Sequence, residues 1–237
     1  MYLGLFFDTI LIHLFLAVLL ATIFYLLPNH GINVFALTQD HLWGIFTSWL
    51  VHGEERHLHS NIIGLLTSVF LLIILYSLAI FLIQKLSNIS VRRVVIRLKT
   101  ALIAVLISSQ VLPSAYLYFA GKVQGILCGA SLLVYGINGM YVPVLFLLLV
   151  LMLAIIEKKV KKPSKLKIRT LNAFQMLLLA SLLTLLILVS HPVFSGFVGA
   201  STPGASALGH SLAFIIGAYT SMLFMAVLVF EIFEECP

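Results

Sequence analysis

The sequence predicts an all-α membrane protein, a single domain over residues 1–237 with six transmembrane helices. Hydrophobic residues make up 62% of the chain and charged residues only 9%, whereas roughly one-quarter of a soluble domain is charged. Several apolar runs reach the about 20 residues that a helix needs to cross a hydrocarbon core about 30 Å thick. The 14 Lys and Arg residues are concentrated in two stretches between such runs.

Apolar runs between polar or turn-forming residues define the six predicted spans. They lie near residues 4–27, 60–84, 100–120, 131–156, 170–190 and 208–230. The first run has full spanning length and lacks the basic leader of a cleaved signal peptide, so we expect it to remain as a helix. It ends at Pro28, and residues 29–58 have the length and composition of a structured loop at the membrane edge. Within this first outer loop, Trp43 and Trp49 suit an interfacial helix.

The basic residues predict the orientation of the spans. Five of them lie between residues 85 and 99 and seven between 158 and 169, so we expect both stretches on the cytoplasmic side. An even number of spans then places both termini there, and segments 28–59, 121–130 and 191–207 face outward. The net charge of +6 is a topology signal of this kind, and we expect the lipid bilayer, but no nucleic acid, among the partners. The predicted location is a multi-pass position in the cell membrane of a prokaryote.

Two cysteines, Cys128 and Cys236, lie near opposite predicted membrane faces. We therefore expect no disulfide between them, and their spacing matches no metal site.

Unusual polar residues gather at the predicted outer ends of three spans. His57 and Asn61 lie at the start of the second span, Ser131 at the start of the fourth and His210 at the start of the sixth. A serine hydroxyl becomes a nucleophile when a base takes its proton, and histidine suits that task near neutral pH. His57 and Asn61, four residues apart on one helical face, are candidate donors for the oxyanion that such an attack creates.

A third, acidic catalytic residue is missing from the predicted site. The only carboxylate within a predicted span is Asp8, so the sequence predicts a dyad of Ser131 and His210. Tyr135 lies one helical turn after Ser131, and we expect its ring to pack against His210 and hold the imidazole in place of a carboxylate.

These residues resemble the motifs of the rhomboid intramembrane serine proteases. Residues 43–61 read WGIFTSWLVHGEERHLHSN, which is similar to the family's W-R and H-x4-H-x3-N pattern. Residues 129–139 read GASLLVYGING, which resembles G-x-S-G-x-x-[YF]-G-x-x-G, and His210 and Gly217 match H-x-x-G-x-x-x-G in the last span. All three motifs occur in the family's order and on one predicted side of the membrane.

The resemblance implies a rhomboid-like bundle that cleaves transmembrane protein substrates near the outer bilayer face, with no cofactor and no metal. It implies Ser131 as nucleophile, His210 as base and Tyr135 as the stacking residue. It further implies an oxyanion hole formed by His57, Asn61 and the Ser131 backbone N–H, with His52 as a structural histidine. Trp43, Gly129 and Gly217 are expected to support the site. The Gly-rich segment 195–209 is expected to cap it.

Three positions depart from the family pattern. Leu132 follows the nucleophile where the family usually has Gly, and we expect it to crowd the dyad. Gly44 replaces the Arg after Trp43, and Ala213 replaces the first Gly of the last motif.

Other interpretations of the same residues stay open. One is a catalytically inactive rhomboid-like protein that binds membrane clients. Another is a metal site or metal transporter built on His52, His57 and His59, although the H-E-x-x-H signature is absent. Ser131 taken alone would be a packing residue, Asn138 a hydrogen-bonding residue between helices, and Ala213, Gly217 and Ser221 a close-packing series.

Overall fold

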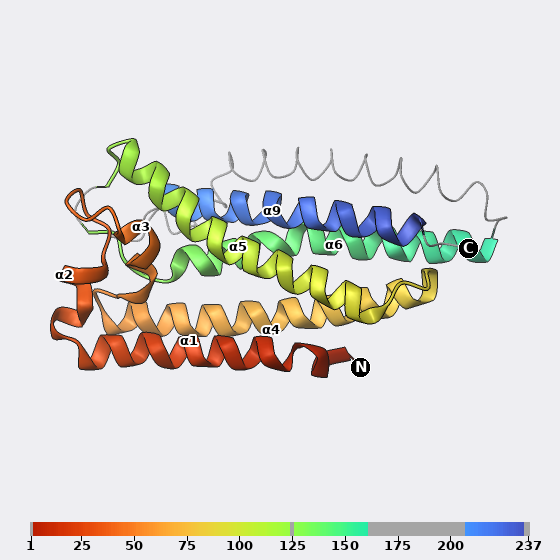
Figure 1. Cartoon of the computed structure of the whole chain (residues 1–237), viewed down its shortest axis with the longest axis horizontal. Helices are drawn as coiled ribbons and strands as arrows, with labels where there is room; N and C mark the ends of the chain where they lie inside the picture. Colours follow the sequence, from red (N-terminus) through yellow and green to blue (C-terminus); the bar gives the residue numbers. More distant parts are fainter. Residues whose placement is uncertain (1, 124–125, 161–206, 235–237) are drawn as a thin grey trace.

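The computed structural model describes residues 2–123, 126–160 and 207–234. Its long helices run along one axis of the molecule (Figure 1). They are α1 (Phe7–Leu26), α4 (Glu55–Leu86), α5 (Val91–Phe119), α6 (Ser131–Val160) and α9 (Ala207–Glu234). Within these described ranges, five segments are long and apolar enough to cross a membrane: Gly4–Leu26, Glu55–Leu86, Val91–Phe119, Ser131–Ile156 and Ala207–Glu234. The chain is an all-α, multi-pass membrane protein, and the predicted span at 170–190 lies outside the described residues.

The observed helices extend beyond the predicted spans. α4 begins at Glu55 rather than near residue 60, and α5 begins at Val91 rather than near residue 100. The connection between them is only residues 87–90, so four of the five basic residues placed in this loop lie on α5 instead. The hydropathy of the sequence marks the apolar part of a helix, whereas backbone hydrogen bonding continues into the polar interface.

Ion pairs stabilise the charged residues at this end of the bundle. Arg97 on α5 pairs with Glu231 on α9 at 2.6 Å, and Lys99 pairs with Asp8 on α1 at 2.7 Å. Asp8, the carboxylate noted within the first span, is thus bound at the end away from the first loop.

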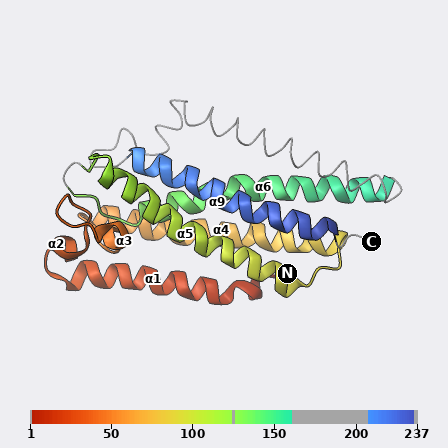
Figure 2. The same ribbon diagram turned by 45° about the horizontal axis from the view of Figure 1, so that its top comes forward.

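The helices pack in a defined order. α6 contacts α4, α5 and α9, while α1 packs mainly against α4. Figures 1 and 2 both show α1 on one side of the bundle and α9 on the other. Between α4 and α6, the Ser68 hydroxyl donates to Asn138 Oδ1 at 2.8 Å and the Tyr141 hydroxyl donates to the Ser68 carbonyl at 2.8 Å. The hydrogen bond between helices predicted for Asn138 is confirmed.

Glycines bring α6 and α9 into backbone contact. A methyl group on Gly217 of α9 would overlap the backbone of Gly136, and one on Gly139 would overlap the carbonyl oxygen of Phe214. Small residues allow this approach in membranes, where close packing replaces the hydrophobic effect between helices. The close packing predicted for Gly217 is confirmed.

The first loop is structured, as predicted. It contains η2 (Pro28–Gly31), α2 (Ile32–Phe35), α3 (Gly44–Thr47) and η3 (Ser48–Leu50). The chain reverses after α1 through three consecutive left-handed residues, Asn29, His30 and Gly31, with φ of 49°, 53° and 71°. Leu37 exchanges two backbone hydrogen bonds of 3.0 Å with Leu127, which ties this loop to the segment before α6.

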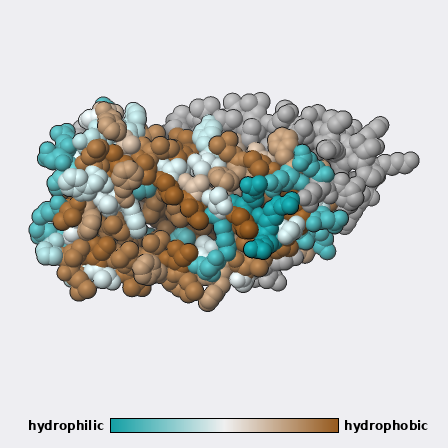
Figure 3. Space-filling view, viewed as in Figure 1, coloured by the Kyte–Doolittle hydropathy of each residue, from teal (hydrophilic) through white to brown (hydrophobic). Residues whose placement is uncertain are grey.

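The distribution of hydrophobic side chains on the surface agrees with a protein that spans a membrane. Figure 3 shows a broad hydrophobic area between hydrophilic residues at the first-loop end and a second hydrophilic group further along the bundle. The exposed side chains of α1 include Leu11, Phe15 and Val18, which suit contact with lipid.

Candidate active site

Helices α4, α6 and α9 all begin at the end of the bundle that carries the first loop (Figures 1 and 2). Ser131 is the first residue of α6, His210 lies in the first turn of α9, and His57 and Asn61 lie in the first two turns of α4. The structure therefore brings the predicted polar residues to one end of three neighbouring helices.

Ser131 and His210 lie within hydrogen-bond reach of each other. His210 Nε2 is 2.9 Å from Ser131 Oγ, a distance that lets the imidazole accept the hydroxyl proton. The two residues are only 9% and 8% exposed. The Tyr135 ring stacks on the His210 imidazole, with centroids 4.3 Å apart and planes inclined by 22°. This contact restricts the imidazole, as the sequence predicted for Tyr135.

Leu132 does not separate the dyad. Its side chain is buried beside Ser131, yet the distance from Ser131 Oγ to His210 Nε2 remains 2.9 Å. The expected crowding is wrong because α6 and α9 approach at Gly136, Gly139 and Gly217, one to two turns further along the helices. Leu at position 132 is therefore compatible with the contact between Ser131 and His210.

Gly44 also has a local explanation. A side chain at residue 44 would overlap the backbone of Leu37, so the Arg that the rhomboid pattern places after Trp43 would not fit in this loop. Trp43 donates from Nε1 to the Val34 carbonyl at 2.7 Å and stacks on His41, and it thereby braces the first loop from its surface.

His52 is a fully buried hydrogen-bond acceptor. Its Nε2 receives the backbone N–H of Ala130 at 3.3 Å and lies 3.0 Å from the Asn61 side-chain nitrogen, which can only donate. Nε2 therefore carries no proton, and the neutral ring keeps its proton on Nδ1. Burial, with a smaller effect of nearby His57, lowers the pKa of His52 to about 3. The ring is thus neutral at physiological pH and holds the peptide that precedes Ser131.

Gly129 shapes the backbone that leads into Ser131. Its φ of +109° lies in a region that favours Gly. A methyl group there would lie 3.0 Å from His57 Nε2 and 3.1 Å from the Asn61 amide nitrogen. Both predicted oxyanion donors therefore border the chain two residues before Ser131. The Asn61 amide has two protons, so after its contact with His52 it can serve a second acceptor.

Sequence reasoning missed two residues that support this region. The Ser48 carbonyl accepts the Gly129 N–H at 2.9 Å, and the Gln110 side chain contacts Ser48 from α5. The sequence contains a signal for Gln110, because a polar amide within an apolar span is costly unless it is hydrogen-bonded. Ser48 had no comparable signal, because a serine in a loop is common and the carbonyl that holds Gly129 is one that every residue possesses.

The remaining cysteine and histidine predictions concern residues near the first loop. Cys128 is free, and burial raises the pKa of its thiol, while Cys236 lies outside the described residues. The His52 and His57 rings meet edge to face with centroids 5.3 Å apart. Within the described ranges, no three His, Cys, Asp or Glu side chains converge as a metal site requires.

The Gly-rich segment 195–209, which the sequence predicts as a cap over the site, is described only in part. Residues 207–209 belong to α9, and the rest lies outside the described residues.

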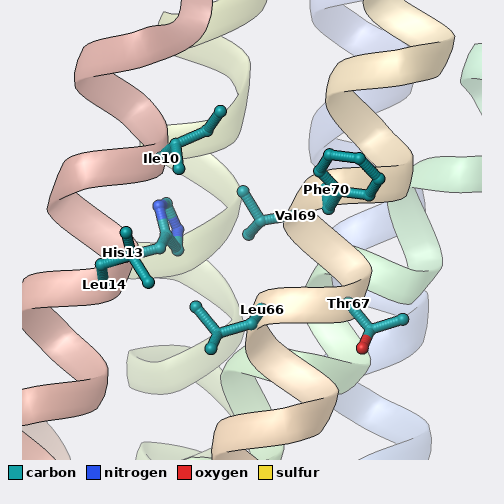
Figure 4. Close-up of a pocket in the computed structure, with 7 residues that line it drawn as sticks. All are labelled: Ile10, His13, Leu14, Leu66, Thr67, Val69 and Phe70. Atoms are coloured by element: carbon teal, nitrogen blue, oxygen red, sulfur yellow. The ribbon is translucent and has the colours of Figure 1, made fainter.

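A pocket of about 360 Å³ lies between α1 and α4, apart from the dyad. Figure 4 shows its lining residues, Ile10, His13, Leu14, Leu66, Thr67, Val69 and Phe70, with the His13 ring projecting from α1 toward α4. His13 Nδ1 donates to the Thr9 carbonyl at 2.8 Å, and its Nε2 is enclosed by protein. The pocket therefore offers mainly apolar contacts.

Comparison of the chain with known protein families, curated proteins and solved structures finds no match.

Proposed function

We propose that this protein is a rhomboid-type intramembrane serine endopeptidase that cleaves transmembrane protein substrates near the outer bilayer face. The observation that carries the proposal is the 2.9 Å contact between Ser131 Oγ and His210 Nε2, with Tyr135 stacked on the imidazole. By contrast, the buried hydroxyls of Ser77 and Ser221 have no hydrogen-bond partner among the described residues.

In the proposed reaction, His210 takes the Ser131 proton while Oγ attacks the scissile carbonyl carbon. The negative charge that develops on the carbonyl oxygen is stabilised by the Ser131 N–H and by the side chains of His57 and Asn61. Because Ser131 is the first residue of α6, its N–H has no partner within the helix and is free to donate. His210 then returns the proton to the leaving amine, and water hydrolyses the acyl-enzyme by the same route.

The proposal includes a six-helix bundle with both termini in the cytoplasm of a prokaryotic cell. α6 ends and α9 begins at opposite ends of the bundle (Figure 1), which supports a further crossing by the predicted span at 170–190. The basic residues of α5 lie at the end away from the dyad, which supports an outward-facing site. The substrate helix must unwind there, because an intact helix hides its peptide bonds.

Labelling by a fluorophosphonate probe tests the nucleophile. The detergent-solubilised wild type should be labelled and should cleave a transmembrane substrate, whereas Ser131→Ala should do neither. Ser77→Ala is a matched control, since Ser77 is also buried but lies on α4 more than four turns from Asn61. His210→Ala should lower labelling about as far as Ser131→Ala. Equal labelling of the wild type and Ser131→Ala would exclude the proposal.

A second candidate is an inactive rhomboid-like protein that binds membrane clients. It is favoured by the low exposure of Ser131 and His210 and by the departures from the rhomboid pattern at Leu132 and Gly44. Capture of transmembrane clients by both the wild type and Ser131→Ala, with no cleavage by either, would support it. Cleavage by purified wild type would remove it.

A further inference from the structure

Gln110 is a buried amide that connects α5 to the first loop. It is 3% exposed, and its Nε2 lies 3.1 Å from Ser48 Oγ, 3.2 Å from the Ile45 carbonyl and 3.3 Å from Ser114 Oγ. Ser114 lies one turn further along α5, whereas Ser48 and Ile45 belong to the first loop. An amide in this apolar setting is stabilised only by such bonds, so Gln110 fixes the loop to the helix.

The first loop in turn holds the chain that enters the dyad. The Gly129 N–H donates to the Ser48 carbonyl at 2.9 Å, and the Ala130 N–H donates to His52 Nε2 at 3.3 Å. The N–H groups of Gly129 and Ala130 are therefore anchored on residues of the first loop, whereas the Ala130 carbonyl accepts from the Leu133 and Val134 N–H groups of α6. Ser48 takes part in both connections, through its hydroxyl to Gln110 and through its carbonyl to Gly129.

We infer that Gln110 is a positioning residue for the oxyanion hole: through Ser48 it fixes the 129–130 backbone and so the direction of the Ser131 N–H. This rests on the proposed function of Ser131. The Ser131 N–H shares its peptide plane with the Ala130 carbonyl, which accepts from the Leu133 and Val134 N–H groups at 3.1 and 3.2 Å. A shift of the 129–130 backbone therefore moves the first turn of α6 and, with it, the Ser131 N–H. A displacement of about 1 Å at a reacting group costs about 100-fold in rate, which is the scale of the expected effect.

Gln110→Met tests the inference, because Met fills a similar volume without donating a hydrogen bond. The variant should lower kcat for a transmembrane substrate at least tenfold and slow fluorophosphonate labelling in parallel, while KM changes less than twofold. Amide hydrogen exchange over residues 126–134 should become about tenfold faster. Ser114→Ala is the matched control, since it removes the contact of Gln110 within α5 and leaves both contacts to the first loop. It should keep the wild-type kcat and exchange.

A double-mutant cycle with Ser48→Ala locates the effect. If Gln110 acts through Ser48, the double variant should be no slower than Gln110→Met alone, whereas independent effects would multiply and overturn the inference. If Gln110→Met does not fold, Ser48→Ala alone tests the inference, because it removes only the hydroxyl that Gln110 contacts. This variant should lower kcat and speed amide hydrogen exchange over residues 126–134.

Hydrogen exchange separates this inference from the proposed function. If the wild type neither labels nor cleaves, the protease proposal fails, and faster exchange in Gln110→Met still supports the backbone anchoring. If the wild type is active and Gln110→Met matches it in both kcat and exchange, the inference is overturned while the protease proposal stands.

Discussion

Substitution of Gly217 by Ala should separate the two helices that carry the dyad. The added methyl group would lie 2.8 Å from the carbonyl carbon and 2.9 Å from the Cα of Gly136, and closer still to the Gly136 carbonyl oxygen. Carbon atoms in contact prefer about 3.5–4.0 Å, so α6 and α9 must move apart by about 1 Å. Because the methyl group would meet backbone atoms of Gly136, no side-chain rotation relieves the overlap.

The displacement should break the contact between Ser131 and His210. A hydrogen bond of 2.9 Å lengthened by about 1 Å exceeds the range in which proton transfer is efficient. We expect the fluorophosphonate labelling rate to fall about 100-fold and the free energy of unfolding to fall by about 1–3 kcal/mol. The labelling rate is measured on the folded fraction, and stability by thermal unfolding in detergent.

Gly4→Ala is the control for this experiment, because no atom lies within 4 Å of the position its methyl group would take. It should match the wild type in labelling rate and unfolding temperature. Wild-type labelling by Gly217→Ala, with an unchanged unfolding temperature, would refute the argument that backbone contact at Gly217 sets the geometry of the dyad.

Three other predictions concern residues around the dyad. Gly129→Ala places a methyl group 3.0 Å from His57 Nε2 at a φ of +109°, so labelling should slow at least tenfold; an unchanged rate would show that this backbone is free to adapt. Tyr135→Phe keeps the ring that stacks on His210 and should remain more active than Tyr135→Leu in a cleavage assay, whereas equal activities would deny the stacking a role. The pKa of His52 is about 3 in the folded protein, against an ordinary value of 6.5, so the unfolded chain binds a proton first as pH falls. The stability from neutral His52 is complete above pH 6.5 and declines toward pH 3, by up to about 1.4 kcal/mol per pH unit. Unfolding by denaturant across this range should depend less on pH in His52→Gln, and equal slopes for variant and wild type would contradict the assignment.

The sequence by itself determined the membrane class and most of the helices. Apolar runs long enough to cross a bilayer leave few alternatives, because every backbone polar group in lipid must be bonded within a helix. The sequence also predicted that Ser131, His210, His57 and Asn61 lie at one end of the bundle, since basic residues orient the spans and each of these residues lies within the first two turns of its helix. Helix ends were less accurate, as at Val91, because charged residues can continue a helix beyond the apolar core.

Only the tertiary structure decided the contacts between helices. The contact from Ser131 Oγ to His210 Nε2 depends on backbone approach at Gly136, Gly139 and Gly217, and no pattern in one helix shows which face its neighbour meets. For the same reason, the expected crowding by Leu132 was wrong. Ser48 holds Gly129 through a carbonyl that every residue possesses, so this contact was visible only in the structure, where the first loop lies against the segment before α6.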